Sequence, residues 1–488
     1  MLNEFMNDTT PVNRRHFLQR QSFGLGSLAL AYLMQREAAA APPKPELERL
    51  TFDLKPRRPA LRPQATAMIS LFMQGGPSHL DLFDPKPELT RRHLQETTEK
   101  FKLDNTAQAS KKLWASPFKF SRRGVCGMEL SELLPNLGRV ADDICLIRSM
   151  HTGNSGHETN IAALNTGRFQ RRRPALGSWI SYALGTENQN LPAFVVLTDP
   201  TGLPVLGVEN WDNAWLPSLY QGAVIRSREP RILNLDPPSA LRGAPQERIL
   251  SYLRDINQEH LARHPGENEL EARIQNYELA ARMQVAAKEA MDISRETAET
   301  RALYGIDKSE TRDYGTRCLI ARRLVERGVR FVQVHTGNQT WDHHGAIQTK
   351  LPAACRKTDK GAAALIQDLK RIGLLDTTLV HWGGEMGRLP VIQNEKSIGR
   401  DHNGEGFSMW LAGGGVRGGQ ILGETDEIGH KAATDIVNHF DYHATLLHLF
   451  GLDPTQASIT RTQGSASLLD SQPGQVISKI LHHPPATI

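Results

Sequence analysis

Short runs of apolar residues recur along this chain, and most of them are followed at once by glycine or by a polar residue. Runs of about four to eight apolar residues between such breakers are typical of β-strands that are buried on both faces. They predict strands at 67–73, 143–149, 193–199, 329–335, 377–382 and 407–414.

Segments rich in helix-forming residues lie between these strands. They predict helices at 129–140, 269–304, 316–327, 358–372 and 441–450. Helices that alternate with short buried strands favour an α/β fold with a mainly parallel central sheet. Residues 200–265 are rich in Pro, Gly, Trp and Asn and show weak periodicity, so we expect an inserted lid or cap there.

The N-terminus has the pattern of a twin-arginine export signal. Arg14 and Arg15 precede an uncharged stretch at 23–34, and the small residues Ala38–Ala41 follow. A short amphipathic helix or a membrane anchor is the alternative, but the apolar stretch is shorter than the ~20 residues that cross a bilayer. We therefore expect a signal peptide at 1–41, a linker at 42–66 and one domain at 67–488, located in the periplasm or secreted by the twin-arginine translocase without stable membrane insertion.

Charge and cysteine content narrow the class of partner. The 58 basic and 53 acidic residues leave a net charge of only +5, which does not indicate nucleic-acid binding but suits an anionic substrate. The four cysteines lie far apart without a Cys-x-x-Cys pair, so they do not form a disulfide framework.

Acidic residues and histidines follow the predicted strands. In open α/β sheets, ligands bind at the carboxyl ends of the strands, so these side chains are expected to share one edge. Imidazoles and carboxylates are ligands of Zn²⁺ or Mn²⁺, and the Asp-x-His spacing of Asp342 and His344 is the sharpest element. The residues at strand ends are His79, Asp81, Asp84, His151, His157, Glu158, Asp342, His343, His344, Glu385 and Arg388, with Arg400, Asp401 and His402 just before the last strand.

Several long motifs resemble one protein family. They include GGPSHLDLFDPKP, RRLVERGVRFVQV, LLDTTLVHWGGEMGR and GRDHNGEGFSMWLAGGGVRGG. This pattern is similar to that of the domain-of-unknown-function family 1501, which comprises exported bacterial proteins related to sulfatases and alkaline phosphatases. The resemblance covers about 67–454 and implies an alkaline-phosphatase-like three-layer fold, with helices flanking a mainly parallel sheet.

The resemblance also implies a site for one or two divalent ions, Zn, Mn or Ca. In the wider superfamily, an acid after the first strand and acids and histidines of the C-terminal half hold paired metals. Met386 stands where that superfamily has a histidine, which disfavours a complete second site. The implied metal ligands are Asp81, Asp342, His344, Glu385 and His402.

The nucleophile position departs from the pattern of sulfatases. Thr166-Gly167-Arg168 matches their Thr-Gly-Arg, but the position of their modified cysteine falls on His157, so formylglycine chemistry is excluded. His157 is a ligand, a base or a nucleophile, and Ser155 is a nearby hydroxyl. We expect catalysis from His157, Ser155 and Arg388, and substrate binding by Arg168, Arg400 and His151.

Together these features predict an exported, metal-dependent hydrolase of phosphate or sulfate esters, acting on a small or polysaccharide anion. The alternatives are a non-catalytic metal-containing protein that binds an anionic polysaccharide, and a mutase or transferase on the same scaffold.

The export signal can be tested by replacing its arginine pair. Arg14→Lys with Arg15→Lys is expected to leave the protein in the cytoplasm, because the signal is read through its guanidinium groups. Cell fractionation and immunoblotting measure the distribution. Equal export of wild type and variant would contradict the assignment.

Overall fold

The structure is a computed structural model, and it describes residues 32–33, 52–103, 110–454, 458–461, 464–470, 472 and 474–485. The predicted signal peptide lies outside the described residues except for 32–33, as does the first part of the linker. One compact unit, Thr51–Gln258 with Asn268–Ile488, contains the central sheet and the side chains at its strand ends, whereas the short segment Glu259–Glu267 belongs to the other unit. Within the described part of the chain, no helix is long and apolar enough to cross a membrane.

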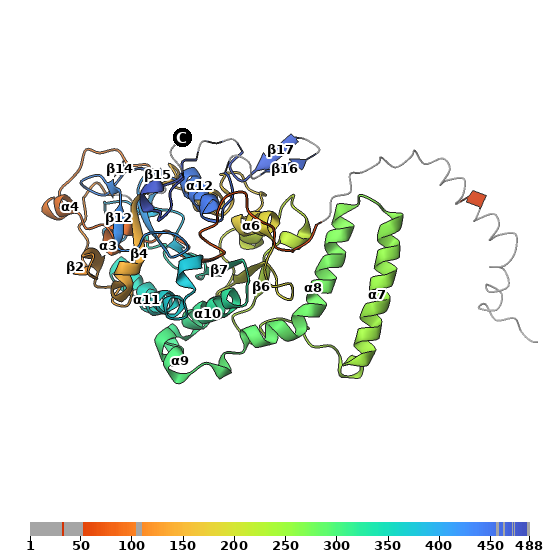
Figure 1. The fold of residues 1–488 in the computed structure, drawn as a ribbon. Helices are drawn as coiled ribbons and strands as arrows, with labels where there is room; N and C mark the ends of the chain where they lie inside the picture. The colour runs from red at the N-terminus through yellow and green to blue at the C-terminus, as the bar shows by residue number, and fades with distance from the viewer. Residues whose placement is uncertain are drawn as a thin grey trace, which may run out of the picture. The chain divides into compact units, whose positions relative to one another are not determined.

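A nine-stranded sheet forms the centre of this unit, and it is mainly parallel (Figure 1). The strand order is β12-β4-β11-β8-β1-β7-β5-β6, with β15 beside β4, and β11 is the strand of this sheet that runs antiparallel to its neighbours. All six predicted strands are confirmed. The strands are β1 (Ala67–Phe72), β4 (Ile144–His151), β5 (Phe194–Leu197), β6 (Ala223–Ile225), β7 (Phe331–His335), β8 (Thr378–Gly383), β11 (Phe407–Ala412), β12 (Gln420–Leu422) and β15 (Val437–Asn438).

Helices cover both faces of the sheet, which gives three layers. Alternate residues of β1 point to opposite faces: Ile69 and Leu71 join the apolar core under α10 and α11, whereas Met68 and Phe72 join the core under α5, α6 and α12. The predicted α/β class with a flanked parallel sheet is therefore confirmed. The helices are α3 (His79–Leu82), α4 (Pro87–Arg91), α5 (His157–Thr166), α6 (Leu176–Leu184), α7 (Ala244–Arg263), α8 (Asn268–Met291), α9 (Ala298–Tyr304), α10 (Ser309–Glu326), α11 (Ile347–Arg371) and α12 (His439–Leu449).

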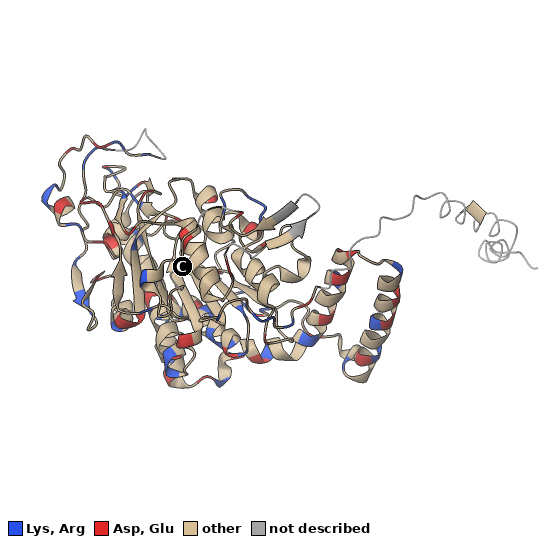
Figure 2. Cartoon of the chain, turned by 45° about the horizontal axis from the view of Figure 1, so that its top comes forward, with Lys and Arg blue, Asp and Glu red and all other residues tan. Residues whose placement is uncertain are grey.

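Small antiparallel pairs lie outside the sheet. They are β2 (Phe120–Arg123) with β3 (Met128–Ser131), β9 (Gly387–Arg388) with β10 (His402–Asn403), β13 (Glu424–Thr425) with β14 (Ala432–Thr434), and β16 (Ser458–Arg461) with β17 (Gly464–Ser467). Acidic and basic residues are interspersed over the described elements (Figure 2).

Two helix predictions need correction, and one helix was not predicted. The segment 129–140 is not a helix: β3 opens it and the 3-10 turn Leu137–Asp143 ends it, because Pro135 stops an α-helix from running through. The predicted helix 269–304 is two helices, α8 and α9, since Asp292 and Thr297 bond the backbone and start new turns. The weakly periodic region 200–265 ends in the 20-residue helix α7, which the sequence reading missed.

The strand ends converge as the parallel topology requires. The segments after β1, β4, β7 and β8 lie at one edge of the sheet, and the antiparallel β11 brings the residues before it to that same edge. Gly75 makes the close approach possible: its φ is 113°, and a Cβ atom there would lie 2.6 Å from the backbone nitrogen of Asp342. Only glycine fits this contact between the β1 and β7 loops.

Three histidines are buried in the core and held neutral. Burial, with the charge of Arg317, lowers the pKa of His335 to about 3, and neither ring nitrogen has a hydrogen-bond partner among the described residues. Burial also lowers the pKa of His381 to about 3 and that of His443 to about 4. An unfolded chain protonates such rings near pH 6.5. The stability that depends on their neutrality is therefore complete above about pH 6.5 and is lost as the pH falls toward the folded pKa values.

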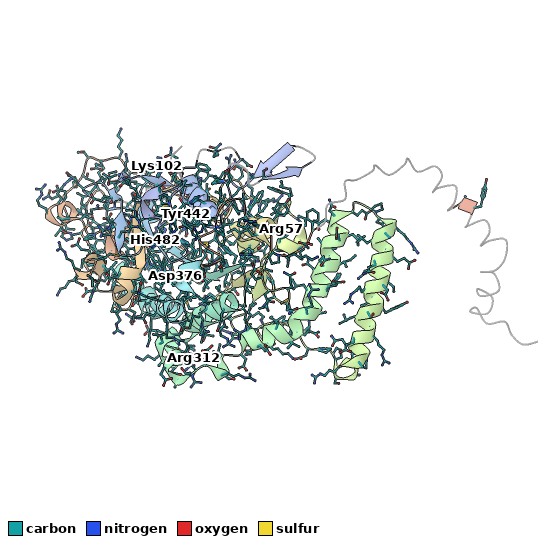
Figure 3. All side chains as sticks on the ribbon, in the orientation of Figure 1. Arg57, Lys102, Arg312, Asp376, Tyr442 and His482 are labelled. Atoms are coloured by element: carbon teal, nitrogen blue, oxygen red, sulfur yellow. The ribbon has the colours of Figure 1, made fainter. Side chains whose placement is uncertain are left out.

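Stability should accordingly fall between pH 7.5 and pH 5, and His335→Leu should weaken that dependence. The substitution removes one site at which the unfolded chain takes up a proton, so the slope should drop by up to ~1.4 kcal/mol per pH unit below pH 6. Urea unfolding at several pH values measures it. His482→Leu, at an exposed position (Figure 3), is the matched control and should leave the slope unchanged. An unaltered slope in His335→Leu would contradict the assignment.

Candidate metal centre

Four side chains gather at the edge of the sheet where the strand ends converge. They are His157, Asp342, His344 and His402, and each offers one nitrogen or oxygen atom within 4.8 Å of the others. His157 begins α5, Asp342 and His344 follow β7, and His402 lies on β10. The predicted convergence of Asp342, His344 and His402 is thus present in the structure, and His157 joins them.

The three imidazoles face the Asp342 carboxylate through the same ring atom. Oδ1 of Asp342 lies 2.9 Å from Nε2 of His344 and 3.3 Å from Nε2 of His402. Oδ2 lies 3.5 Å from Nε2 of His157. Ligand atoms at about 2 Å from a tetrahedral zinc ion lie about 3.3 Å from one another. The two spacings to Oδ1, 2.9 and 3.3 Å, are close to the edge length of such a tetrahedron, and all four ligand atoms lie within 4.8 Å of one another.

The opposite ring nitrogen of each histidine is bonded to an oxygen. Nδ1 of His157 lies 2.6 Å from Oε1 of Glu385, and Nδ1 of His402 lies 2.8 Å from the carbonyl oxygen of Ser155. Carboxylate and carbonyl oxygens only accept, so these Nδ1 atoms carry the proton.

His344 follows the same arrangement, with its Nδ1 atom 2.5 Å from Oε1 of Gln393. This hydrogen-bond pattern directs the lone pair of each Nε2 atom into the cluster, as metal-binding histidines require. Nε2 of His157 is buried and has no hydrogen-bond partner among the described residues, which fits a missing ligand bond.

Glu385 lies behind this cluster rather than in it. Its side chain is fully buried, and its two oxygens accept hydrogen bonds from the backbone nitrogen of Gly75 at 3.0 and 3.2 Å. Because Oε1 also bonds His157, the Glu385 carboxylate connects the loop after β1, the end of β8 and the start of α5. The structure therefore places Glu385 as a partner of His157, although it was predicted as a metal ligand.

The Arg388 guanidinium compensates the negative charge of Asp342 from within the protein interior. Its guanidinium is fully buried and lies 2.6 Å from Oδ1 of Asp342. Its other donors bond the carbonyl oxygens of Gly76 at 2.8 Å and of Arg400 at 3.1 Å, and that of Gly75. These contacts leave Arg388 enclosed by the protein, so its geometry does not fit the predicted role of a group that meets substrate.

The charges of the cluster shift the pKa values of Asp342 and His157. Burial alone would raise the pKa of Asp342, but the three histidines and Arg388 outweigh it and hold that pKa well below its usual range. Burial alone would lower the pKa of His157, but Asp342 and Glu385 outweigh it and raise the pKa to about 9. Without an ion, the His157 ring between these two carboxylates therefore favours its protonated form. A metal would have to displace the proton on Nε2.

Asp81 and Arg400 form a separate ion pair. Both side chains are fully buried, and Nε of Arg400 lies 2.8 Å from Oδ2 of Asp81. Ser78 donates to the same carboxylate at 2.5 Å, and the guanidinium lies 4.5 Å from the centre of the Trp114 ring. The structure does not bring Asp81 to the metal cluster, and it does not expose Arg400 to a substrate.

The remaining predicted residues lie around the cluster. Ser155 contributes its carbonyl oxygen to His402, as described above. Arg168, beyond the end of α5, lies over the Phe440 ring at 5.9 Å, and His151 ends β4. Among the described residues, no hydrogen bond or ion pair joins either of these two side chains to the cluster.

Sequence reasoning missed the partner of His344. Gln393 lies 49 positions from His344, and no motif marks it. The sequence allows His157 to be a ligand, a base or a nucleophile. Its position after a predicted strand was the signal that it could lie beside the metal ligands.

A family profile matches most of the chain. The sequence profile of a family described as "Protein of unknown function (DUF1501)" matches residues 65–481. No curated protein sequence matches the chain.

Solved structures give weaker similarities. They include a phosphonate monoester hydrolase from Silicibacter pomeroyi, with 10% identity, a TM-score of 0.35 and coverage of 87% of this chain and 78% of that chain. A sulfatase from Pseudoalteromonas sp. has 12% identity, a TM-score of 0.34 and coverage of 80% and 68%. The lipoteichoic acid synthase of Listeria monocytogenes has 11% identity, a TM-score of 0.33 and coverage of 85% and 78%. At these scores, the similarity carries no inference about activity or substrate.

Two carboxylates can be compared to test the centre. Asp342→Asn is expected to lower metal content at least tenfold, because it removes the charged ligand that the three imidazoles face. Asp81→Asn should keep the metal but destabilise the fold by about 3–5 kcal/mol, because it leaves the Arg400 guanidinium buried without its partner.

Elemental analysis of purified protein and thermal unfolding measure the two effects. Metal loss in Asp81→Asn with full retention in Asp342→Asn would reverse the assignment.

Proposed function

This chain belongs to the DUF1501 family, and we propose that it is an exported, metal-dependent hydrolase of phosphate or sulfate esters. One observation carries the proposal: three Nε2 atoms face one carboxylate, and the Nδ1 atom of each ring is held by an oxygen. An arrangement that orients three imidazoles in this way has its chemical use in holding a cation.

The donor set favours zinc. Three nitrogens and one carboxylate oxygen suit Zn²⁺ and, less well, Mn²⁺. Calcium takes six to eight oxygen ligands, so this donor set does not fit it.

The buried charges favour a single ion. Asp81, predicted for a second site, is neutralised by Arg400, and Glu385 is occupied by His157 and the Gly75 amide. The Arg388 guanidinium supplies a fixed positive charge beside Asp342, where a second cation would be repelled. We therefore propose one ion per chain.

A bound divalent ion supplies Lewis acidity toward an ester oxygen. The protein's own contribution is to position the anion. Gly156 precedes α5 without a side-chain cap, so the amides of the first turn of that helix remain to hold phosphoryl or sulfuryl oxygens. His344 is the most exposed of the four residues, with 34% of its side chain accessible, so the substrate would enter from its side.

The residues around the cluster then take three roles. His157 faces Asp342, so we assign it to the ion instead of to nucleophilic attack. Ser155 is the candidate nucleophile, since its backbone already borders the cluster through His402. We further propose that His151 and Arg168 bind the outer part of an anionic substrate.

The cellular setting is proposed from the signal sequence. Export by the twin-arginine translocase would place the protein in the periplasm or outside the cell, where an anionic polysaccharide or a small ester is the substrate. Translocation in the folded state would allow the ion to be loaded before export.

One observation favours a non-catalytic alternative. Four protein ligands complete the coordination of a tetrahedral zinc ion, whereas catalytic sites usually keep a position open. A binding protein for an anionic polysaccharide would need the metal centre only for structure.

Metal analysis combined with an ester screen distinguishes the two proposals. We expect the wild type to contain about one zinc per chain and to hydrolyse aryl phosphate or sulfate esters. His344→Ala should lose both metal and activity because an imidazole ligand is removed, whereas Ser155→Ala should keep the metal and lose activity. His448→Ala, on α12 and outside the cluster, is the matched control. A wild type that carries zinc but hydrolyses no ester would support the binding protein, and a wild type without metal would defeat both.

A further inference from the structure

Helix α7 exposes its apolar side chains to water. None of its 20 residues is buried. Ile249, Tyr252 and Ile256 recur at helical spacing and are 43%, 66% and 42% exposed, and Leu253 beside them is 46% exposed. A helix of this length owes its stability mainly to burial of an apolar face against another element. Among the residues that the structure describes, none covers this apolar face of α7.

An apolar groove separates this helix from α8. It has a volume of about 750 Å³, and apolar residues from α7, α8 and the segment before them line it. Helix α8 contributes five buried residues to the two apolar cores, whereas α7 contributes none. The main apolar lining residues are Leu233, Leu235, Leu250, Leu253, Tyr277 and Met283.

The exposed apolar surface is large enough for a stable interface. Eight large side chains on the hairpin and the segment leading into it are 38–71% exposed: Leu233, Leu241, Ile249, Tyr252, Leu253, Ile256, Tyr277 and Val285. At roughly 150–250 Å² per large side chain, they leave on the order of 800 Å² in water. A stable protein interface buries about 800 Å² on each partner, whereas the largest patch of a typical monomer is about 300–600 Å².

The charges of the hairpin favour a protein partner. Helix α7 carries three acidic and three basic residues, and α8 carries four acidic and three basic residues. Helices that bind anionic membranes are rich in Lys and Arg on their polar face. This balanced hairpin (Figure 2) has no such excess.

We propose that the α7–α8 hairpin is a homodimer interface, in which it packs on the same hairpin of a second copy. Two helices from each copy complete a four-helix bundle, an arrangement that buries apolar faces of helices of this length. The same patch serves both copies, as a twofold interface requires. In the dimer, the stripe of Ile249, Tyr252 and Ile256 packs against the apolar groove of the partner.

The mass of the protein in solution tests this interface. We expect purified protein to sediment at about twice the mass of one chain between about 1 and 100 µM, a range in which an interface of standard size is populated. Leu253→Glu should produce a monomer, because it puts a charge into the buried groove. Val125→Glu, which replaces an apolar residue that is 98% exposed on the turn between β2 and β3, should remain a dimer.

Folding and metal content separate this proposal from the metal centre. The hairpin contributes no residue to the cluster, so Leu253→Glu should keep the circular dichroism spectrum and zinc content of the wild type. A wild type that is monomeric at 100 µM would overturn the interface. So would a Leu253→Glu variant that remains dimeric, or a monomeric wild type that co-sediments with anionic vesicles.

Discussion

The carboxylate of Asp342 is the group on which the arrangement of the centre depends. A buried carboxylate is stable only when its charge is compensated, and here three imidazoles and one guanidinium surround it. Each of those partners comes from a different segment: the start of α5, the loop after β7, β9 and β10. Compensation of one charge thus draws together the loops that cover one edge of the sheet. The same convergence brings together the four side chains that we propose as ligands of one cation.

The surrounding hydrogen bonds extend this constraint into the fold. Glu385 ties His157 to the Gly75 amide, and Gly75 in turn lies against the backbone of Asp342. A side chain at position 75 would push apart the loops after β1 and β7. Both the glycine and the compensated charge of Asp342 therefore keep these two loops in contact. These links fix the loop that carries Asp342 and the start of α5 against the end of β8 and the loop after β1.

Paired charges decide which acids are available to a ligand. Asp81 is fully buried and the side chain of Asp342 is 12% exposed, and Arg400 bonds both oxygens of Asp81. Asp342 shares one oxygen with Arg388 and presents the other to His157. The two acids therefore have different chemistry, because the Arg400 guanidinium and the Ser78 hydroxyl already bond the oxygens of Asp81, whereas Oδ2 of Asp342 faces His157 at 3.5 Å.

The sequence by itself determined the layers of the fold and the edge that carries the centre. Buried strands are recognisable as local apolar runs, and parallel topology sends residues such as Asp342 and His344 to one edge. Local patterns also marked a helix at 441–450 but missed α7, whose apolar side chains are exposed in the described part of the chain. Only the tertiary structure decided that Arg400 takes Asp81, that Glu385 and Gln393 orient histidines, and that His157 joins the ligands. Those outcomes depend on distances of 2.5–3.2 Å between residues up to 319 positions apart, and spacing along the chain does not encode such distances.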